Sequence, residues 1–215
     1  MNKELQEAIK KYSLSHKEFH SHLLDKSKDN LIGMLSDLIT MYINDKNSST
    51  LREFLTTSIA GYTHLEDKIG YNGYKQSSYK KPIYCEVKPK NIFSKSNKKL
   101  NGGGNFTDYT WERFKKDKKA NPNMLISGFI DGELIYIIEF PFNSKNFLSH
   151  LEEKLKQRFP NGDKKGEYLR SLSFSFKHYK NDNPKAIFKR KNLTNYEKYI
   201  TKELFNFLKE KNGAK

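Results

Sequence analysis

The stretch that decides the fold of this chain is Lys80-Lys81-Pro82-Ile83-Tyr84-Cys85-Glu86-Val87-Lys88. Apolar and polar side chains alternate along it, which predicts a β-strand. Ile83, Cys85 and Val87 then lie on one face of this strand, and Tyr84, Glu86 and Lys88 lie on the other. Pro89 follows and has no N–H to donate, so we expect the regular pairing of the strand to end there.

Helical periodicity dominates the residues before this strand. Apolar side chains recur every three or four positions between residues 23 and 43, which predicts an N-terminal helical region over residues 1–48. Thr50 and Glu53 form a capping-box pattern, so a second helix is expected to run from there to about Gly61. We expect the N-terminal region to pack on a core formed by residues 49–215, within one structural domain.

Helices and strands alternate after the strand as well. Residues 91–105 are basic and rich in glycine, which predicts a long loop. We expect a helix over 107–119, a hairpin over 124–140 that turns at Asp131-Gly132, a helix over 147–159 and a strand over 168–179. Thr194 and Glu197 repeat the capping-box pattern and predict a C-terminal helix.

The chain is strongly basic. Its 215 residues include 40 Lys and Arg against 25 Asp and Glu, a formal net charge of +15, which suits a nucleic-acid partner. No stretch approaches the roughly 18 to 20 consecutive apolar residues of a membrane helix, and the acids near the N-terminus argue against a secretory signal. Cys85 is a single cysteine and is expected to be a buried structural thiol, so a cytoplasmic location is expected.

Glu86 and Lys88 are the most specific candidates for catalytic residues. Both side chains lie on one face of the predicted strand, so the carboxylate can hold a metal while the ammonium group reaches an attacking water or a scissile phosphate. Asp67 lies upstream with Glu66 beside it, and a second acid completes an all-oxygen site for Mg²⁺. The alternative is an incidental ion pair on a solvated sheet face. The histidines form no metal-binding signature.

Several stretches of the chain resemble the PD-(D/E)XK nuclease superfamily, and specifically small type II restriction endonucleases. They are Leu65-Glu66-Asp67-Lys68-Ile69-Gly70-Tyr71-Asn72-Gly73-Tyr74, Tyr84-Cys85-Glu86-Val87-Lys88-Pro89-Lys90-Asn91, Gly104-Asn105-Phe106-Thr107-Asp108-Tyr109-Thr110 and residues 123–132. The resemblance implies an α/β (α+β) fold with a restriction-endonuclease-like mixed β-sheet core flanked by helices. It also implies sequence-specific, Mg²⁺-dependent cleavage of double-stranded DNA.

The same resemblance assigns roles to individual residues. Glu86 is implied as a metal-ligating acid and Lys88 as the catalytic lysine. Asp67 is the expected second metal ligand, with Glu66 as the alternate, because Asn72 occupies the turn position where some relatives have Asp. Cleavage of both strands needs two active sites, which predicts a homodimer. A cognate DNA methyltransferase is implied as a cellular counterpart.

Lysine and asparagine side chains near the strand and in the following loop are candidates for DNA contacts. Lysines neutralise phosphates, and asparagine can read an adenine edge. The candidates are Lys75, Lys90, Asn91, Lys95, Lys98, Asn101 and Asn105. The triple glycine at residues 102–104 is either part of this DNA-contacting loop or a flexible connection. The alternative function is a non-catalytic basic DNA-binding protein, in which Glu86 and Lys88 are incidental.

Overall fold

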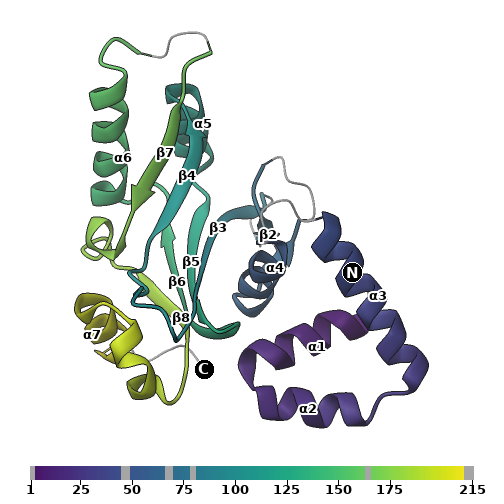
Figure 1. The fold of residues 1–215 in the computed structure, drawn as a ribbon. Coiled ribbons are helices and arrows are strands. Elements are labelled where there is room, and N and C mark those ends of the chain that lie inside the picture. Colours follow the sequence, from purple (N-terminus) through teal and green to yellow (C-terminus); the bar gives the residue numbers. More distant parts are fainter. Residues whose placement is uncertain (1–2, 45–48, 66–69, 78–80, 163–165, 211–215) are drawn as a thin grey trace.

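The structure is a computed structural model that describes residues 3–44, 49–65, 70–77, 81–162 and 166–210 (Figure 1). Its helices are α1 (Lys3–Leu14), α2 (His16–Leu24), α3 (Lys28–Asn44), α4 (Thr50–Ile59), α5 (Trp111–Ala120), α6 (Lys145–Arg158) and α7 (Lys202–Glu210), with 3-10 helices η1 (Phe176–His178) and η2 (Leu193–Tyr199). Its strands are β1 (Thr63–His64), β2 (Gly73–Lys75), β3 (Ile83–Ile92), β4 (Gly104–Tyr109), β5 (Asn123–Ile130), β6 (Glu133–Pro141), β7 (Leu169–Phe174) and β8 (Lys185–Lys189).

The centre of the fold is a six-stranded mixed sheet in the order β1-β2-β3-β5-β6-β8. β3 and β5 are parallel, and the other neighbours are antiparallel. β4 and β7 pair only with each other and form a separate antiparallel ribbon among the described strands. The predicted α/β class with a mixed sheet and flanking helices is therefore confirmed.

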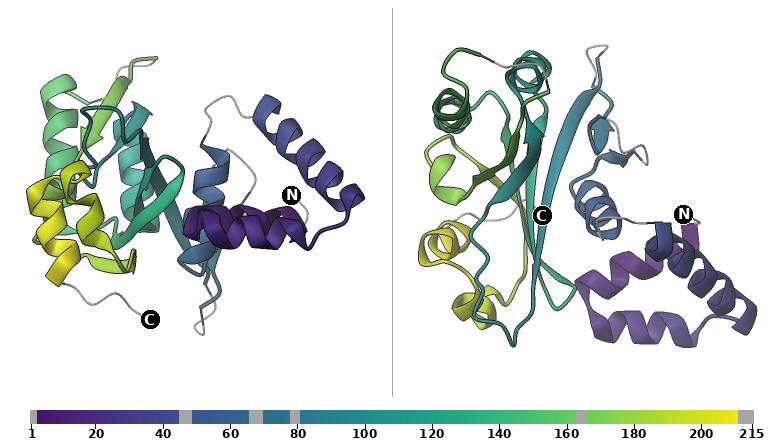
Figure 2. Two further views of the ribbon diagram at one scale, coloured as in Figure 1. Left: turned by 60° about the horizontal axis from the view of Figure 1, so that its bottom comes forward. Right: turned by 45° about the horizontal axis from the view of Figure 1, so that its top comes forward.

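Two layers cover the two faces of this sheet. α4 packs on the face that carries Cys85 and Val87, where Phe54 and Leu55 complete an apolar core. A second core lies on the opposite face, beneath the β4–β7 ribbon and the helices α5, α6 and α7. Figure 2 shows α4 and the N-terminal helices on one side of the strands and α6 and α7 on the other. β3 is therefore covered on both faces.

The N-terminal region is helical over its described residues, as predicted, but it is broken into α1, α2 and α3. Ser15 caps the start of α2 by accepting a hydrogen bond from the backbone N–H of Glu18. Leu5 and Ala8 of α1 meet Met34 of α3 in a small apolar cluster, and α1 also packs against α4 and β6. None of the described helices is both long and apolar enough to cross a bilayer.

The prediction that pairing ends at Pro89 is wrong, because β3 pairs with β5 as far as Ile92. The backbone N–H of Val87 points away from β5, toward Asn72, whose Oδ1 accepts it at 2.7 Å. Since backbone groups two residues apart on a strand point the same way, the nitrogen of Pro89 also points to the side where pairing with β2 has already ended at Cys85. The proline therefore removes no hydrogen bond from the β3–β5 ladder.

The loop and helix predicted after β3 are only partly correct. The loop is shorter than residues 91–105, because β3 continues to Ile92 and β4 begins at Gly104. The helix begins at Trp111 rather than at 107, because Thr110 is extended and its side chain accepts a hydrogen bond from the N–H of Arg113. The predicted helix end is confirmed, with Asn121 in the left-handed conformation at φ 46°.

The hairpin prediction is confirmed. The helices predicted from the two capping-box patterns are also present, as α4 and α7, but neither begins with the predicted cap. Asp131 and Gly132 have positive φ values of 50° and 83°, as a type I′ turn requires. Ser49 rather than Thr50 is the N-cap of α4, and the C-terminal α-helix begins at Lys202 after the 3-10 helix η2. The strand predicted over 168–179 ends at Phe174, and the helix α6 begins two residues earlier than predicted.

Candidate active site

Glu86 and Lys88 project from the same face of the central strand β3. The Nζ atom of Lys88 lies 2.7 Å from Oε1 of Glu86, and the two side chains are only 17% and 10% exposed, respectively. The ion pair of the alternative interpretation is therefore present, but it is buried rather than on a solvated sheet face. Removing two charges from water is costly, and replacing a buried ion pair by apolar residues often stabilises a protein. A buried pair of this kind is consequently weak evidence for a role in stability alone.

Arg113 of α5 adds a second cation to the pair. Its Nη2 atom lies 3.6 Å from the same Oε1 atom of Glu86. The guanidinium group lies over the rings of Phe106 and Tyr109, and Lys88 also lies over Phe106, with its Nζ atom 4.7 Å from the ring centroid. Aromatic rings attract cations and shield them from water. The aromatic side chains of β4 thus hold both cations beside one carboxylate.

Asp117 holds the other side of Arg113. Its Oδ2 atom lies 3.7 Å from Nε of Arg113, one helical turn earlier on α5, and accepts a hydrogen bond from the hydroxyl of Tyr109. Its Oδ1 atom accepts a second hydrogen bond, from the hydroxyl of Tyr71. Burial raises the pKa of the Asp117 carboxyl, and burial together with this carboxylate raises the pKa of both tyrosines, so the hydroxyls stay protonated and donate. Arg113 is therefore fixed between two carboxylates.

Asn72 connects β3 to α4 on the side away from β5. Its Oδ1 atom accepts the N–H of Val87, and its Nδ2 group donates to Oε2 of Glu53 at 3.2 Å. An aspartate at position 72 would have no N–H to donate, so its carboxylate would repel the carboxylate of Glu53. The neighbouring Glu53 thus gives a physical reason for asparagine at position 72. Glu53, which the sequence suggested only as a helix cap, has this role instead.

The two acids predicted upstream, Glu66 and Asp67, lie outside the described residues. Their described flank is close to β3, because the N–H of Leu65 donates to the carbonyl of Asn72, and the N–H of Asn72 donates to the carbonyl of Cys85. Among the described residues, no group of three or more His, Cys, Asp or Glu side chains could hold a metal. The donor set nevertheless fits Mg²⁺, which proteins commonly bind through one or two carboxylates, with water and substrate phosphate completing the shell. Glu86 already attracts two cations.

The predicted DNA-contacting residues do not gather in one place. Lys90 shares the face of Glu86 and Lys88, and its Nζ atom lies 3.4 Å from Oδ1 of Asn101, while burial and the nearby Lys98 lower its pKa. Asn105 is exposed on β4. Lys75 and Asn91 are not with the site, because Lys75 pairs with Glu139 and Asn91 accepts the N–H of Gly132. Lys95 is exposed in the loop beside Asp131.

The glycines at 102 and 103 are packed tightly rather than flexible. Both are buried, and the carbonyl of Gly102 accepts the hydroxyl of Tyr179. A β-carbon on Gly103 would lie 2.1 Å from the carbonyl oxygen of Phe174, and one on Gly104 would lie 2.6 Å from Cβ of Lys88. The glycines therefore let β4 approach β7 and β3 closely. They place the start of β4 directly against Lys88.

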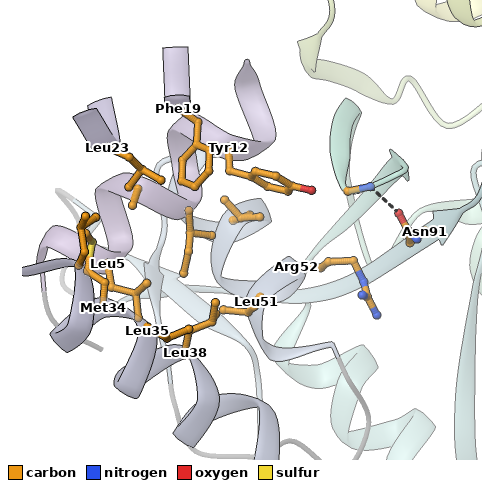
Figure 3. A pocket seen from close by; sticks show the side chains of 15 residues that line it. Leu5, Tyr12, Phe19, Leu23, Met34, Leu35, Leu38, Leu51, Arg52 and Asn91 are labelled. Atoms are coloured by element: carbon orange, nitrogen blue, oxygen red, sulfur yellow. Dashed lines mark hydrogen bonds between the residues drawn. The ribbon is translucent and has the colours of Figure 1, made fainter. Parts of the chain in front are cut away.

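A separate apolar cavity of ≈ 460 Å³ lies between the N-terminal helices and α4 (Figure 3). Leucine and aromatic side chains such as Tyr12, Phe19 and Leu35 line it, with Arg52 and Asn91 at one end. Its wall holds no carboxylate, histidine or cysteine among the described lining residues. It therefore offers no acidic, imidazole or thiol ligand for a metal among the described residues.

Sequence reasoning identified Glu86 and Lys88 but missed the residues around them. Arg113 and Asp117 are one helical turn apart and follow Tyr109 closely, which was the available signal. The sequence does not reveal that α5 packs over the same face of the sheet as Glu86. Comparison with the models of protein families gave no match, and a search of curated proteins gave no significant match either. The function must therefore be argued from this site.

Proposed function

We propose that this protein is an Mg²⁺-dependent endonuclease that hydrolyses double-stranded DNA at specific sequences, of the type II restriction class that its sequence resembles. The observation that supports this most is the contact of Lys88 with Glu86 on one face of a central strand, where both side chains are largely buried. The mixed sheet with helices on both faces agrees with the fold that the resemblance implies.

The charges around Glu86 suit a phosphodiester substrate. Two cations, Lys88 and Arg113, meet one carboxylate, and the basic residues of the surrounding chain favour approach of a polyanion. Arg113 remains 39% exposed, so its guanidinium group can contact a phosphate oxygen from the solvent side. Asp117 and the two tyrosines fix its position, which lowers the cost of orienting it during the reaction.

Each residue then has a role in the hydrolysis. Glu86 would hold the metal, with Asp67 as the proposed second acid. A bound Mg²⁺ ion supplies positive charge that polarises the phosphoryl oxygen and acidifies a water molecule. Lys88 orients or deprotonates the attacking water, and Arg113 stabilises the negative charge that develops on the phosphoryl oxygens. Cleavage of both strands would use two copies of the chain, whose two-fold axis matches that of a palindromic site.

The test is digestion of plasmid DNA by the purified chain in Mg²⁺, with Glu86→Ala and Lys88→Ala beside the wild type. We expect discrete fragments from the wild type and a loss of about 10²–10⁴-fold in rate in each variant, the range typical of a positioned acid or base. Binding of the plasmid should persist in both variants. Lys17→Ala and Glu18→Ala are matched controls, because both side chains are exposed on α2.

Two outcomes would contradict the proposal. Full activity in either Glu86→Ala or Lys88→Ala would remove these residues from the chemistry. Intact plasmid that is only retarded by the wild type, with and without Mg²⁺, would favour the alternative of a non-catalytic basic DNA-binding protein.

A further inference from the structure

The β4–β7 ribbon presents one buried and one exposed face. Phe106 and Tyr109 of β4, with Leu172 and Phe174 of β7, point into the core. The alternate residues are exposed, and the register places Asn105 opposite Ser173 and Thr107 opposite Ser171. The outer face thus has an uncharged centre of amide and hydroxyl groups, held by a ribbon whose other face is fixed in the core. Figure 1 shows the ribbon lying alongside α6.

The side chains at the centre of this face are already oriented. Oδ1 of Asn105 accepts hydrogen bonds from the hydroxyls of Ser171 at 2.8 Å and Ser173 at 3.2 Å. Because the amide is planar, its Nδ2 group lies on the opposite side, and no described residue accepts its protons. The amide is therefore prepared to donate, and the serine oxygens retain lone pairs that can accept. Such groups match the hydrogen-bonding edges of base pairs.

Positive side chains border this uncharged centre. Arg170 is exposed on β7. Lys154 and Arg158 of α6 line a shallow groove together with Ser171 and Ser173. Protein–DNA interfaces commonly combine basic contacts to phosphates, which position the protein, with uncharged polar contacts to bases, which specify the sequence. Asp108, the acidic residue among the exposed positions of the two strands, suits the amino group of a cytosine.

The ribbon is also connected to the proposed catalytic lysine. Gly104, its first residue, packs against Cβ and Cγ of Lys88. Phe106, two residues later, lies under the ammonium group of Lys88. The ribbon thus contacts Lys88 at two successive inward-facing positions, and a shift of the ribbon on docking would move these contacts.

We propose that the β4–β7 ribbon enters the major groove of double-stranded DNA and reads base edges through Asn105, Ser171 and Ser173. The major groove, about 12 Å wide, admits a two-stranded ribbon. This inference rests on the proposed function for its duplex substrate. It goes beyond that proposal because it assigns recognition to a β-ribbon whose β7 strand, with its two serines, lies far from Glu86 in the sequence.

The test compares Asn105→Ala and the double variant Ser171→Ala/Ser173→Ala with the wild type on short duplexes. The cognate site is first defined by sequencing the ends of wild-type digestion products. Binding to the cognate duplex and to each one-base variant is then measured in Ca²⁺ by fluorescence anisotropy, and cleavage is measured in Mg²⁺. We expect the preference for the cognate duplex to fall by roughly 5- to 150-fold, the range for loss of one good base contact. Ser21→Ala/Ser36→Ala, on exposed helix positions, should retain it.

The outcomes separate this inference from the proposed function. Cleavage with unchanged preference in both ribbon variants would overturn the inference and leave the nuclease in place. If the wild type does not cleave, a duplex library enriched by binding replaces the mapped site, and the same anisotropy comparison decides the inference. Absence of any sequence preference in the wild type, or tighter binding of single strands than of duplexes, would overturn it. Because the altered side chains are exposed, the thermal unfolding midpoints should stay within a few degrees of the wild-type value.

Discussion

Substitution of Gly104 by alanine tests whether β4 fixes the position of Lys88. A β-carbon at residue 104 would lie 2.6 Å from Cβ and 2.8 Å from Cγ of Lys88, and 2.9 Å from Cζ of Phe174. Carbon atoms in contact normally lie about 3.5–4.0 Å apart, so the two strands must separate by roughly 1 Å. β4 is held by pairing with β7, and β3 is held by β2 and β5. We expect a loss of about 1–3 kcal/mol in the free energy of unfolding, as in other overpacked cores.

Gly104→Ala should also slow cleavage by the protein that remains folded. A displacement of about 1 Å at a reacting group costs on the order of 100-fold in rate. Single-turnover cleavage with saturating protein and Mg²⁺ should therefore slow by about this factor. The unfolding midpoint should fall by about 2–4 °C for each kcal/mol lost, so most of the protein remains folded at the assay temperature.

Gly33→Ala is the matched control for this experiment. A β-carbon at Gly33 meets nothing within 4 Å, and the residue lies within helix α3. Alanine is favoured over glycine in a helix by about 0.5–1 kcal/mol, so this variant should be slightly more stable and cleave normally. A wild-type cleavage rate in folded Gly104→Ala, whatever its stability, would refute the reasoning that β4 positions Lys88.

Further predictions concern the upstream acids, the metal requirement, the pKa of Asp117 and the loop after β3. Among single alanine variants at Asp67, Glu66 and Asn72, the largest loss of cleavage in saturating Mg²⁺ is expected at Asp67; a larger loss at Asn72 would make the turn residue the true counterpart. Cleavage should require Mg²⁺ or Mn²⁺ and be weak or absent in Ca²⁺, so turnover in a chelator would exclude metal catalysis. Burial raises the pKa of Asp117 above its ordinary value of 3.8, so the folded state binds this proton more tightly than the unfolded chain and loses stability as the pH rises from about 3.8 through the raised pKa. The unfolding midpoint of Asp117→Asn relative to the wild type should accordingly rise over that interval, and a difference independent of pH would contradict this. Lys98→Ala should weaken binding to all duplexes alike and lower the slope of affinity against salt by about one unit, which a titration at several salt concentrations will measure.

Local signals in the sequence were sufficient to predict much of the fold. Alternation placed Glu86 and Lys88 on one face of a strand, and the Asp131-Gly132 pair identified the hairpin, because both depend on neighbouring residues. The capping-box patterns at Thr50 and Thr194 predicted helices that are present but misplaced their caps, because such short motifs occur by chance. In the folded chain, Glu53 bonds to Asn72 rather than to the helix end.

Long-range contacts account for the remaining differences. Gly104 reads as part of a loop, but pairing with Phe174 and contact with Lys88 make it the first residue of a strand. The approach of Arg113 to Glu86 depends on how α5 packs on the sheet. The residues of β3 or α5 alone do not determine that packing. The candidate site was therefore predictable as a pair of residues on β3 but not as the cluster that surrounds them.

The proline in β3 has a consequence for how the protein behaves at high concentration. Beyond Cys85, no described strand pairs with β3 on this side, so among the described residues it is an edge onto which another chain could add. A new strand would need backbone donors there, but Asn72 already accepts the N–H of Val87, and Pro89 has no N–H. The arrangement breaks the row of donors at two successive positions. The edge of this ten-residue strand is thus a poor template for edge-to-edge pairing, which disfavours aggregation by that route.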